Sequence, residues 1–320
     1  MSILAIDTPM PQHQTAGAPP PSEPPVLASG GPTRVGRFWP LFLRQPRALV
    51  GVGIVVVLLA VALLAPVFSP YPPNLVLPNG LTLVGAPIAP ELHMPFILGT
   101  DQIGRDELSR LLYGSRTSLL VGILSTGAAL VAGTVVGTVS AYYGGALDTV
   151  LMRVVDVIMS LPLLLAVILL ASLMRPSVLT VVGAIAFFTW PVLARVARSQ
   201  TLEAVRRPYV EAARALGARD GGILVRHVLP AVFPVALTYS TLQVATNILT
   251  AASLSFLGIG VPPPAADWGS MTAQGLAYYQ VAPWLVILPG TALAVTTLGF
   301  NYLGDGLRLA VDPMGRHRVR

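Results

Sequence analysis

Residues 48–68 read A-L-V-G-V-G-I-V-V-V-L-L-A-V-A-L-L-A-P-V-F, a run of 21 residues without a charged side chain. A helix needs about 20 mostly apolar residues to cross the hydrocarbon core of a bilayer. The whole chain has the same character: apolar residues make up 54% of it and charged residues 11%. A soluble domain carries about 25% charged residues. The segment therefore predicts a transmembrane helix in a membrane protein.

Five further segments satisfy the same length and polarity criteria, near residues 119–143, 150–174, 177–194, 231–257 and 281–303. The charge-free stretch 228–266 is too long for one span, and we expect Gly258, Gly260 and Pro262 to Pro264 to end its helix. We therefore expect an all-α polytopic membrane protein with six transmembrane helices. Within residues 119–143, Gly133 and Gly137 form a face on which a sister subunit or a neighbouring helix could pack closely.

The arginines predict the orientation of the chain, because cytoplasmic loops accumulate basic residues. If the N-terminus is cytoplasmic, fifteen arginines lie inside and four lie outside. We therefore expect a multi-pass protein of the plasma (inner) membrane with both termini in the cytoplasm. Residues 1–45 read as a disordered, proline-rich cytoplasmic tail, residues 69–118 as a long extracytoplasmic loop, residues 195–230 as a cytoplasmic loop, and residues 304–320 as a cytoplasmic C-terminus.

Several kinds of chemistry are excluded by the residues that the chain lacks. It has no cysteine and no lysine, so it has no thiolate, no Schiff-base amine and no phosphate-binding loop of the form G-x-x-x-x-G-K-[ST]. Its four histidines are scattered without metal-ligand spacing. We predict no catalytic residue, no metal site and no cofactor in this chain, and no nucleic-acid partner. Any ATP that drives the protein must be bound by another chain.

The loop at residues 195–230 is predicted to fold into two short helices that meet at a glycine elbow. Pro208 suits the first turn of a helix, and Glu211 places a negative charge near the same helix N-terminus. Gly217 supplies the left-handed conformation of a helix exit. Asp220 begins the segment Asp-Gly-Gly, which we expect to turn the chain towards the next span. A pair of amphipathic helices that lies on the inner leaflet of the membrane would have a similar sequence pattern. A rigid element of this kind, however, suits docking to a soluble partner.

Two other clusters of polar residues could carry function. Asp106 can cap a helix that leads into the second span. The charges around it could contact a substrate, or they could only fix the shape of a solvated loop, which we favour. Arg153 and Asp156 lie three positions apart inside the third predicted span, so they can pair on one helix face. Their position near the cytoplasmic end favours structural pairing over a role in transport.

The loop at residues 195–230 resembles the E-A-A-x-x-x-G-x(9)-I-x-L-P coupling loop of ABC importer permeases. The matching residues are Glu211, Ala212, Ala213, Gly217, His227, Leu229 and Pro230, with His227 in the place of the isoleucine. A second block resembles the L-G-T-D-x-x-G-R-D segment of C-type permease subunits of dipeptide and oligopeptide importers, through Gly99, Thr100, Asp101, Gly104, Arg105 and Asp106. Two further blocks, at residues 253–271 and 301–313, extend the resemblance to about residues 34–315.

This resemblance implies a type I ABC importer permease fold and a defined set of partners. They are a homologous B-type permease, two ATP-binding subunits that hold ATP and Mg, an extracytoplasmic substrate-binding protein and membrane lipid. Peptides are the expected cargo, with nickel, glutathione or a sugar as alternatives. An ion-coupled secondary transporter would require carboxylates near the membrane midplane, and an intramembrane enzyme would require paired catalytic groups. An exporter is a further alternative, against which the coupling loop speaks.

Overall fold

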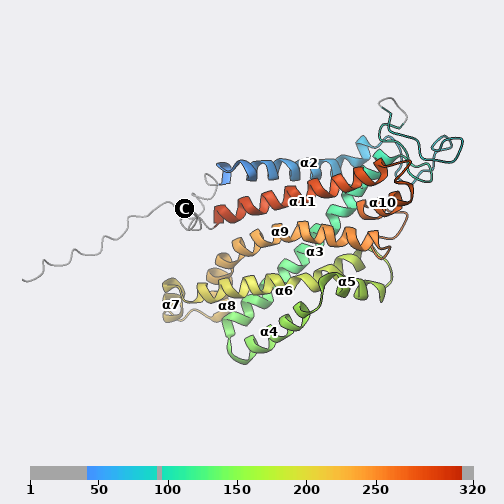
Figure 1. Ribbon diagram of the computed structural model, residues 1–320. Coiled ribbons are helices and arrows are strands. Elements are labelled where there is room, and N and C mark those ends of the chain that lie inside the picture. The colour runs from blue at the N-terminus through green and yellow to red at the C-terminus, as the bar shows by residue number, and fades with distance from the viewer. Residues whose placement is uncertain (1–41, 92–95, 312–320) are drawn as a thin grey trace, which may run out of the picture.

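The computed structural model describes residues 42–91 and 96–311, and the arrangement of its helices is shown in Figure 1. Most of the predicted tail therefore lies outside the described residues, as do residues 312–320. The helices are α2 (Pro46–Phe68), α3 (Glu107–Tyr143), α4 (Gly145–Ser160), α5 (Leu163–Ser172), α6 (Val178–Val205), α7 (Pro208–Ala215), α8 (Asp220–Ile223), α9 (Leu229–Phe256), α10 (Trp268–Gly275) and α11 (Trp284–Val311). A π-helical turn, η1 (Leu224–Val228), joins α8 to α9, and a 3-10 turn, η2 (Leu276–Tyr278), follows α10.

Five helical segments in the described part of the chain are long and apolar enough to cross a membrane. They are α2, α3, α6, the continuous segment Asp220–Phe256 and α11; α4 and α5 make a sixth span if this bent pair is counted as one. At a rise of about 1.5 Å per residue, the 37 residues of α3 extend well beyond a hydrocarbon core of about 30 Å. The all-α membrane fold expected from the sequence is confirmed.

The third predicted span, residues 150–174, differs from the expectation of one continuous helix. The chain bends by 90° between α4 and α5. Pro162 lies at this break and Leu161 before it is extended, with ψ of 136°. Proline has no amide hydrogen to donate and disfavours helical backbone in the residue before it, so the helix ends here.

Helix α3 runs through the middle of the bundle and packs on α6 and α9 through small residues. A Cβ atom at Gly137 would lie 2.2 Å from the carbonyl oxygen of Ala194, and one at Gly133 would lie 2.6 Å from that of Trp190, both on α6. Glycine therefore allows the two backbones to approach closely, as is common between helices in lipid. The packing face predicted from the glycine spacing is confirmed, and its partner is a helix of the same chain.

Polar side chains also join these helices. The side-chain nitrogen Nδ2 of Asn247 on α9 donates to the hydroxyl oxygens of Ser125 (3.2 Å) and Thr126 (2.9 Å) on α3. Helix α2 packs on α11, where Gly51 would place a Cβ atom 2.4 Å from the amide nitrogen of Leu303. Many apolar side chains of α2 remain exposed, among them Leu63 and Val67 at 75% each, as lipid-facing or subunit-facing residues would be.

The two ends of the bundle carry different structures (Figure 1). At one end lie α7, α8, the start of α2 and the end of α11. At the other end lie α5, α10 and the long loop that connects α2 to α3. The described part of the predicted C-terminal segment continues α11 to Val311, eight residues beyond the expected end of the span at residue 303. These two ends hold the two blocks of candidate functional residues.

Candidate functional site

The segment of α7 and α8, residues 208–223, contains most of the predicted coupling residues. Pro208 is at the first position of α7 and Glu211 is in its first turn, as predicted. The expected first helix of the loop is the end of α6, which continues unbroken to Val205. A short connection at Arg206 and Arg207 then leads into α7.

Gly217 ends α7 in the way that the sequence predicts. Its φ is +79°, in the left-handed region that favours glycine. The amide of Gly217 donates to the carbonyl of Arg214 (3.0 Å), and the amide of Ala218 donates to the carbonyl of Ala213 (3.1 Å). These two bonds form a Schellman motif, which satisfies carbonyl groups at the helix end. The chain therefore leaves α7 in a fixed direction.

The predicted turn at Asp220 to Gly222 is wrong: these residues form α8. The turn lies earlier, at Leu216 and Gly217, and the helix that starts at Asp220 continues through η1 into α9. The two consecutive glycines suggested a turn, but Asp220 favours the first turn of a helix and the α9 helix extends back to it. The hydroxyl of Tyr142 on α3 donates to the carboxylate of Asp220 (2.7 Å) and ties this end to the bundle.

An apolar cluster anchors the segment and leaves its outer face open. Val210 of α7, Ile223 of α8 and Val228 of η1 are completely buried, packed with residues of α6 and α9. Glu211, Ala212, Gly217 and Pro230 are exposed, whereas Ala213, His227 and Leu229 are partly buried. The ring of His227 lies 6.2 Å from that of Tyr209 of α7. The structure thus places Glu211 to Gly217 together on an anchored, exposed projection, with His227 beside it.

At the opposite end, the predicted block at residues 99–106 forms a tightly hydrogen-bonded turn. The hydroxyl of Thr100 donates to the carbonyl of Gly80 (2.6 Å) and accepts from the amide of Ile88 (2.8 Å). Gly99 and Gly104 have φ values of +77° and +85°. The carboxylate of Asp106 accepts from the amide of Ser109 (2.7 Å), which confirms the predicted helix cap.

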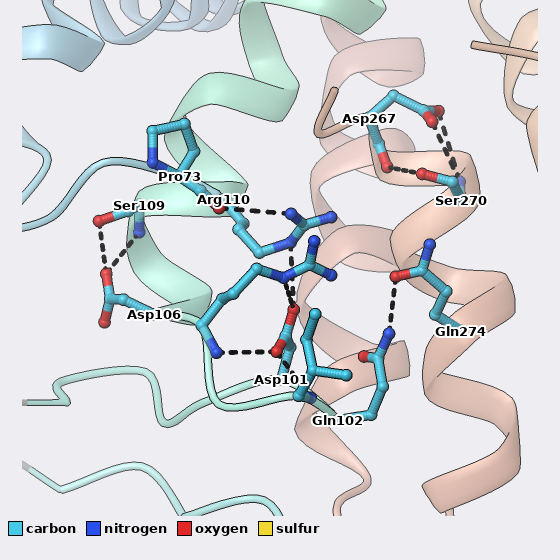
Figure 2. A network of polar contacts seen from close by, with 11 residues as sticks. Pro73, Asp101, Gln102, Asp106, Ser109, Arg110, Asp267, Ser270 and Gln274 are labelled. Atoms are coloured by element: carbon cyan, nitrogen blue, oxygen red, sulfur yellow. Dashed lines mark hydrogen bonds and ion pairs between the residues drawn. The ribbon is translucent and has the colours of Figure 1, made fainter. Parts of the chain in front are cut away.

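The charges of this block are buried, which differs from the solvated loop that we favoured. Asp101, Asp106 and Glu107 are 1–2% exposed and Arg105 is 8% exposed. Asp101 accepts from the Nε of Arg105 (2.5 Å) and faces the Nε of Arg110 (3.4 Å), as Figure 2 shows for Asp101 and Arg110. Asp101, Arg105 and Asp106 can be buried because each has an opposite charge or a backbone donor within hydrogen-bond distance. The spacing of the charged residues in the sequence does not indicate that the rest of the α2–α3 loop and α10 cover them.

The predicted pair of Arg153 and Asp156 does not form. The carboxylate of Asp156 accepts from Arg195 of α6 (2.6 Å). Both groups are about half exposed, so this contact contributes little to stability. A stronger pair lies nearby, where Arg198 of α6 donates two hydrogen bonds to Asp148 of α4 (2.7 and 2.6 Å). Helix spacing favoured the local pair, but α6 presents its arginines to α4 across the helix contact.

Comparison with known proteins relates most of the chain to one family. The family described as "Binding-protein-dependent transport system inner membrane component" matches residues 130–316, and the "N-terminal TM domain of oligopeptide transport permease C" matches residues 33–83. A putative peptide permease protein of Brucella suis is 40% identical over 90% of this chain and 93% of its own length. The chain belongs to this permease family. It is the permease subunit of an ABC importer.

Other relatives of the permease carry names for different cargo. The dipeptide transport system permease protein of Haemophilus influenzae is 35% identical, over 88% of this chain and 95% of its own. The glutathione transport system permease protein of Pectobacterium atrosepticum is 38% identical, over 86% and 90%. In its fold, the permease is similar to the methionine ABC transporter MetNI in an inward-facing conformation, with a TM-score of 0.54 over 63% of this chain and 96% of that one, at 19% identity.

Two buried acids of the permease were not singled out from the sequence. Glu107 is 1% exposed, and one of its carboxyl oxygens has no hydrogen-bond partner among the described residues. Asp267 caps α10 through the amides of Gly269 (3.0 Å) and Ser270 (3.4 Å), and burial raises the pKa of its carboxyl. An aspartate directly before Trp-Gly-Ser is a recognisable cap signal. Nothing in the local sequence indicates the burial of Glu107.

Proposed function

We propose that this permease imports di- or oligopeptides. The observation that carries the proposal is its similarity to the peptide and dipeptide permeases, at 40% and 35% identity over nearly their whole lengths. Alignments of 290 and 282 residues include both candidate blocks. The permease would form the translocation path together with a homologous B-type permease, and an extracytoplasmic binding protein would deliver the peptide.

We infer that the α7–α8 segment receives the ATP-binding subunits. An exposed helix with a fixed exit and a buried apolar base can transmit force without deforming, and Glu211 to Gly217 lie on such an element. This role places the α7 end in the cytoplasm. The start of α2 and the end of α11 lie at the same end, so both termini would be cytoplasmic (Figure 1).

The division of labour between subunits follows from this docking. The two ATP-binding subunits would hold ATP and Mg, and this chain would catalyse no bond chemistry. Closure of those subunits would favour one of two conformations of the permease pair through the α7–α8 segment. A ligand shifts such an equilibrium only by its differential affinity for the two states, so the contacts at α7 must differ between them.

Glutathione is a second candidate cargo, because a glutathione permease is 38% identical to this chain. Reconstitution distinguishes the candidates. The complete complex, purified from its own host and placed in proteoliposomes with its binding protein, is supplied with labelled dipeptides, labelled oligopeptides or labelled glutathione. ATP-dependent uptake of dipeptides or oligopeptides supports the proposal. Uptake of glutathione alone, or of none of the three, contradicts it.

A further inference from the structure

A cavity of about 560 Å³ lies at the end of the bundle opposite α7. Its wall is formed by the end of α5, the loop at residues 258–265, α10, and two arginines, Arg105 and Arg110. The lining contains no aspartate or glutamate. Its volume lies within the range of about 300–1,000 Å³ that is usual for small-molecule sites. The cavity is therefore large enough for a small ligand and has two arginines in its wall.

The hydrogen bonds of the two arginines leave donors available to this cavity. Each arginine is directed at Asp101 through its Nε atom. One terminal nitrogen of Arg110 donates to the carbonyl of Pro73 (3.3 Å). The other terminal nitrogens of both residues have no acceptor in the described parts of the chain. A guanidinium offers five donors in a planar fork that matches a carboxylate, so the free donors are suited to that group.

A third donor and an apolar wall complete the site. The side-chain oxygen of Gln274 on α10 accepts from the amide nitrogen of Gln102 (2.9 Å), as Figure 2 shows. In this arrangement the side-chain nitrogen of Gln274 has no acceptor among residues 42–91 and 96–311. Ile259, Val261 and Pro262 line another part of the cavity. A few convergent donors against an apolar wall are typical of sites that orient a small ligand.

We propose that this cavity binds the free C-terminal carboxylate of the peptide cargo, through Arg105, Arg110 and Gln274. The inference rests on the proposed function and names the part of the cargo that the site recognises. Asp101 acts from behind as a positioning residue that holds the two guanidinium groups side by side. An acidic side chain of the binding protein offers the same chemistry. The small volume and the apolar lining favour the cargo.

The test measures binding of a free-acid dipeptide and of its C-terminal amide to the complete complex in nanodiscs. The binding protein is omitted, so its own selectivity does not enter, and ligand-observed NMR detects the weak binding of either compound. The wild type is expected to bind the free acid at least ten-fold more tightly. Arg105→Gln is expected to weaken free-acid binding by roughly ten- to a hundred-fold and to abolish the preference, because it removes charged donors. The control is Arg116→Gln, which removes an exposed arginine that stacks on Tyr113 at the same end of α3 and should change nothing.

A second pair of variants leaves both arginines and Asp101 intact. Ala273 lines the cavity. Ala273→Glu places a carboxylate beside the arginines and is expected to displace the free acid, whereas Ala273→Gln adds nearly the same volume without charge. Ala273→Glu should therefore weaken binding of the free acid at least five-fold more than Ala273→Gln does. Equal effects of the two variants would overturn the proposal.

Two further results would also overturn it. One is equal binding of acid and amide to the wild type. The other is an Arg105→Gln variant that still prefers the free acid over the amide but binds the binding protein at least ten-fold more weakly. That result would assign the arginines to docking of the binding protein. Failure of the proposed function is recognised separately, because the wild-type complex would then import no dipeptide even with its binding protein. Intact import with no acid preference refutes only the assignment of the cavity.

Discussion

Replacing Gly217 tests whether the fixed exit of α7 is needed for coupling. Gly217 has φ of +79°, and a Cβ atom added there would meet no atom within 4 Å. Any effect of a larger residue must therefore come from backbone strain and not from a steric clash. For residues other than glycine the left-handed conformation costs about 1–2 kcal/mol, and a β-branched residue lies at the upper end.

The two hydrogen bonds of the Schellman motif set the size of the effect. Both hydrogen bonds lie at the surface, so each stabilises the exit of α7 by about 0.5 kcal/mol, and the two together by about 1 kcal/mol. In Gly217→Val the free segment can lose these bonds and relieve about 2 kcal/mol of strain. Docking must then restore the strained exit, at a net cost of about 1 kcal/mol. We expect the permease to bind its ATP-binding subunits about five-fold more weakly, with a matching fall in uptake per ATP.

The measurement is a titration of the ATP-binding subunits onto nanodisc-bound permease pairs, with uptake in proteoliposomes alongside. Gly217→Asn should stay close to the wild type, because asparagine tolerates this conformation. Gly183→Val is the control, since it adds the same side chain to helical backbone of α6, outside the α7–α8 segment, that also has open space around it. Normal docking by Gly217→Val, or equal damage from Gly217→Asn, would refute the role assigned to the α7 exit.

Three further predictions concern packing and charge. Gly137→Val should destabilise the detergent-solubilised permease by about 3 kcal/mol, because its Cβ would lie 2.2 Å from a backbone oxygen of α6, whereas Gly183→Val, which meets open space, should leave the melting temperature nearly unchanged. Asp148→Asn should lower the free energy of unfolding by about 1–2 kcal/mol, measured by a thermal melt. Adding Arg198→Gln to this variant should destabilise it little further, because the two side chains share one bidentate contact. Fully additive effects of the two substitutions would contradict the pairing. Burial raises the pKa of Asp267, so the stability that its protonated form contributes is fully present below about pH 4 and is lost as pH rises through the raised pKa. The melting temperature should therefore fall over that pH range. An Asp267→Asn variant whose melting temperature depends on pH as steeply as that of the wild type would contradict this.

Much of the fold could be predicted because hydrophobic length is a local property. Uninterrupted apolar runs identified the membrane helices, and the spacing of Gly133 and Gly137 identified the face of α3 on which another helix packs. Helix ends were also predictable where one residue controls them. Asp106 caps α3 and Gly217 ends α7, because each acts through its own backbone or through an amide three residues away.

The features that sequence reasoning missed depend on contacts between distant segments. Asp156 has a potential partner one helical turn away, yet it pairs with Arg195, 39 positions later, because α4 and α6 lie side by side. Likewise, the charge pattern around Asp101 could not show that the loop is buried, since α10 lies about 170 residues further along the chain, a separation given by the hydrogen bond between Gln102 and Gln274. The bend at Pro162 does have a local cause, but a proline within an apolar run can kink a span as well as end its helix.

Site-specific cross-linking can show whether α7 receives the ATP-binding subunits. The chain contains no cysteine, so one introduced cysteine provides a unique attachment point for a thiol-reactive photo-cross-linker. Ala212→Cys places it on the exposed face of α7, and Leu83→Cys places it on a fully exposed residue of the α2–α3 loop at the other end. In the complex purified from its host, we expect a product with an ATP-binding subunit from position 212 and none from position 83. An ATP-binding subunit captured from position 83, or from neither position, would contradict it.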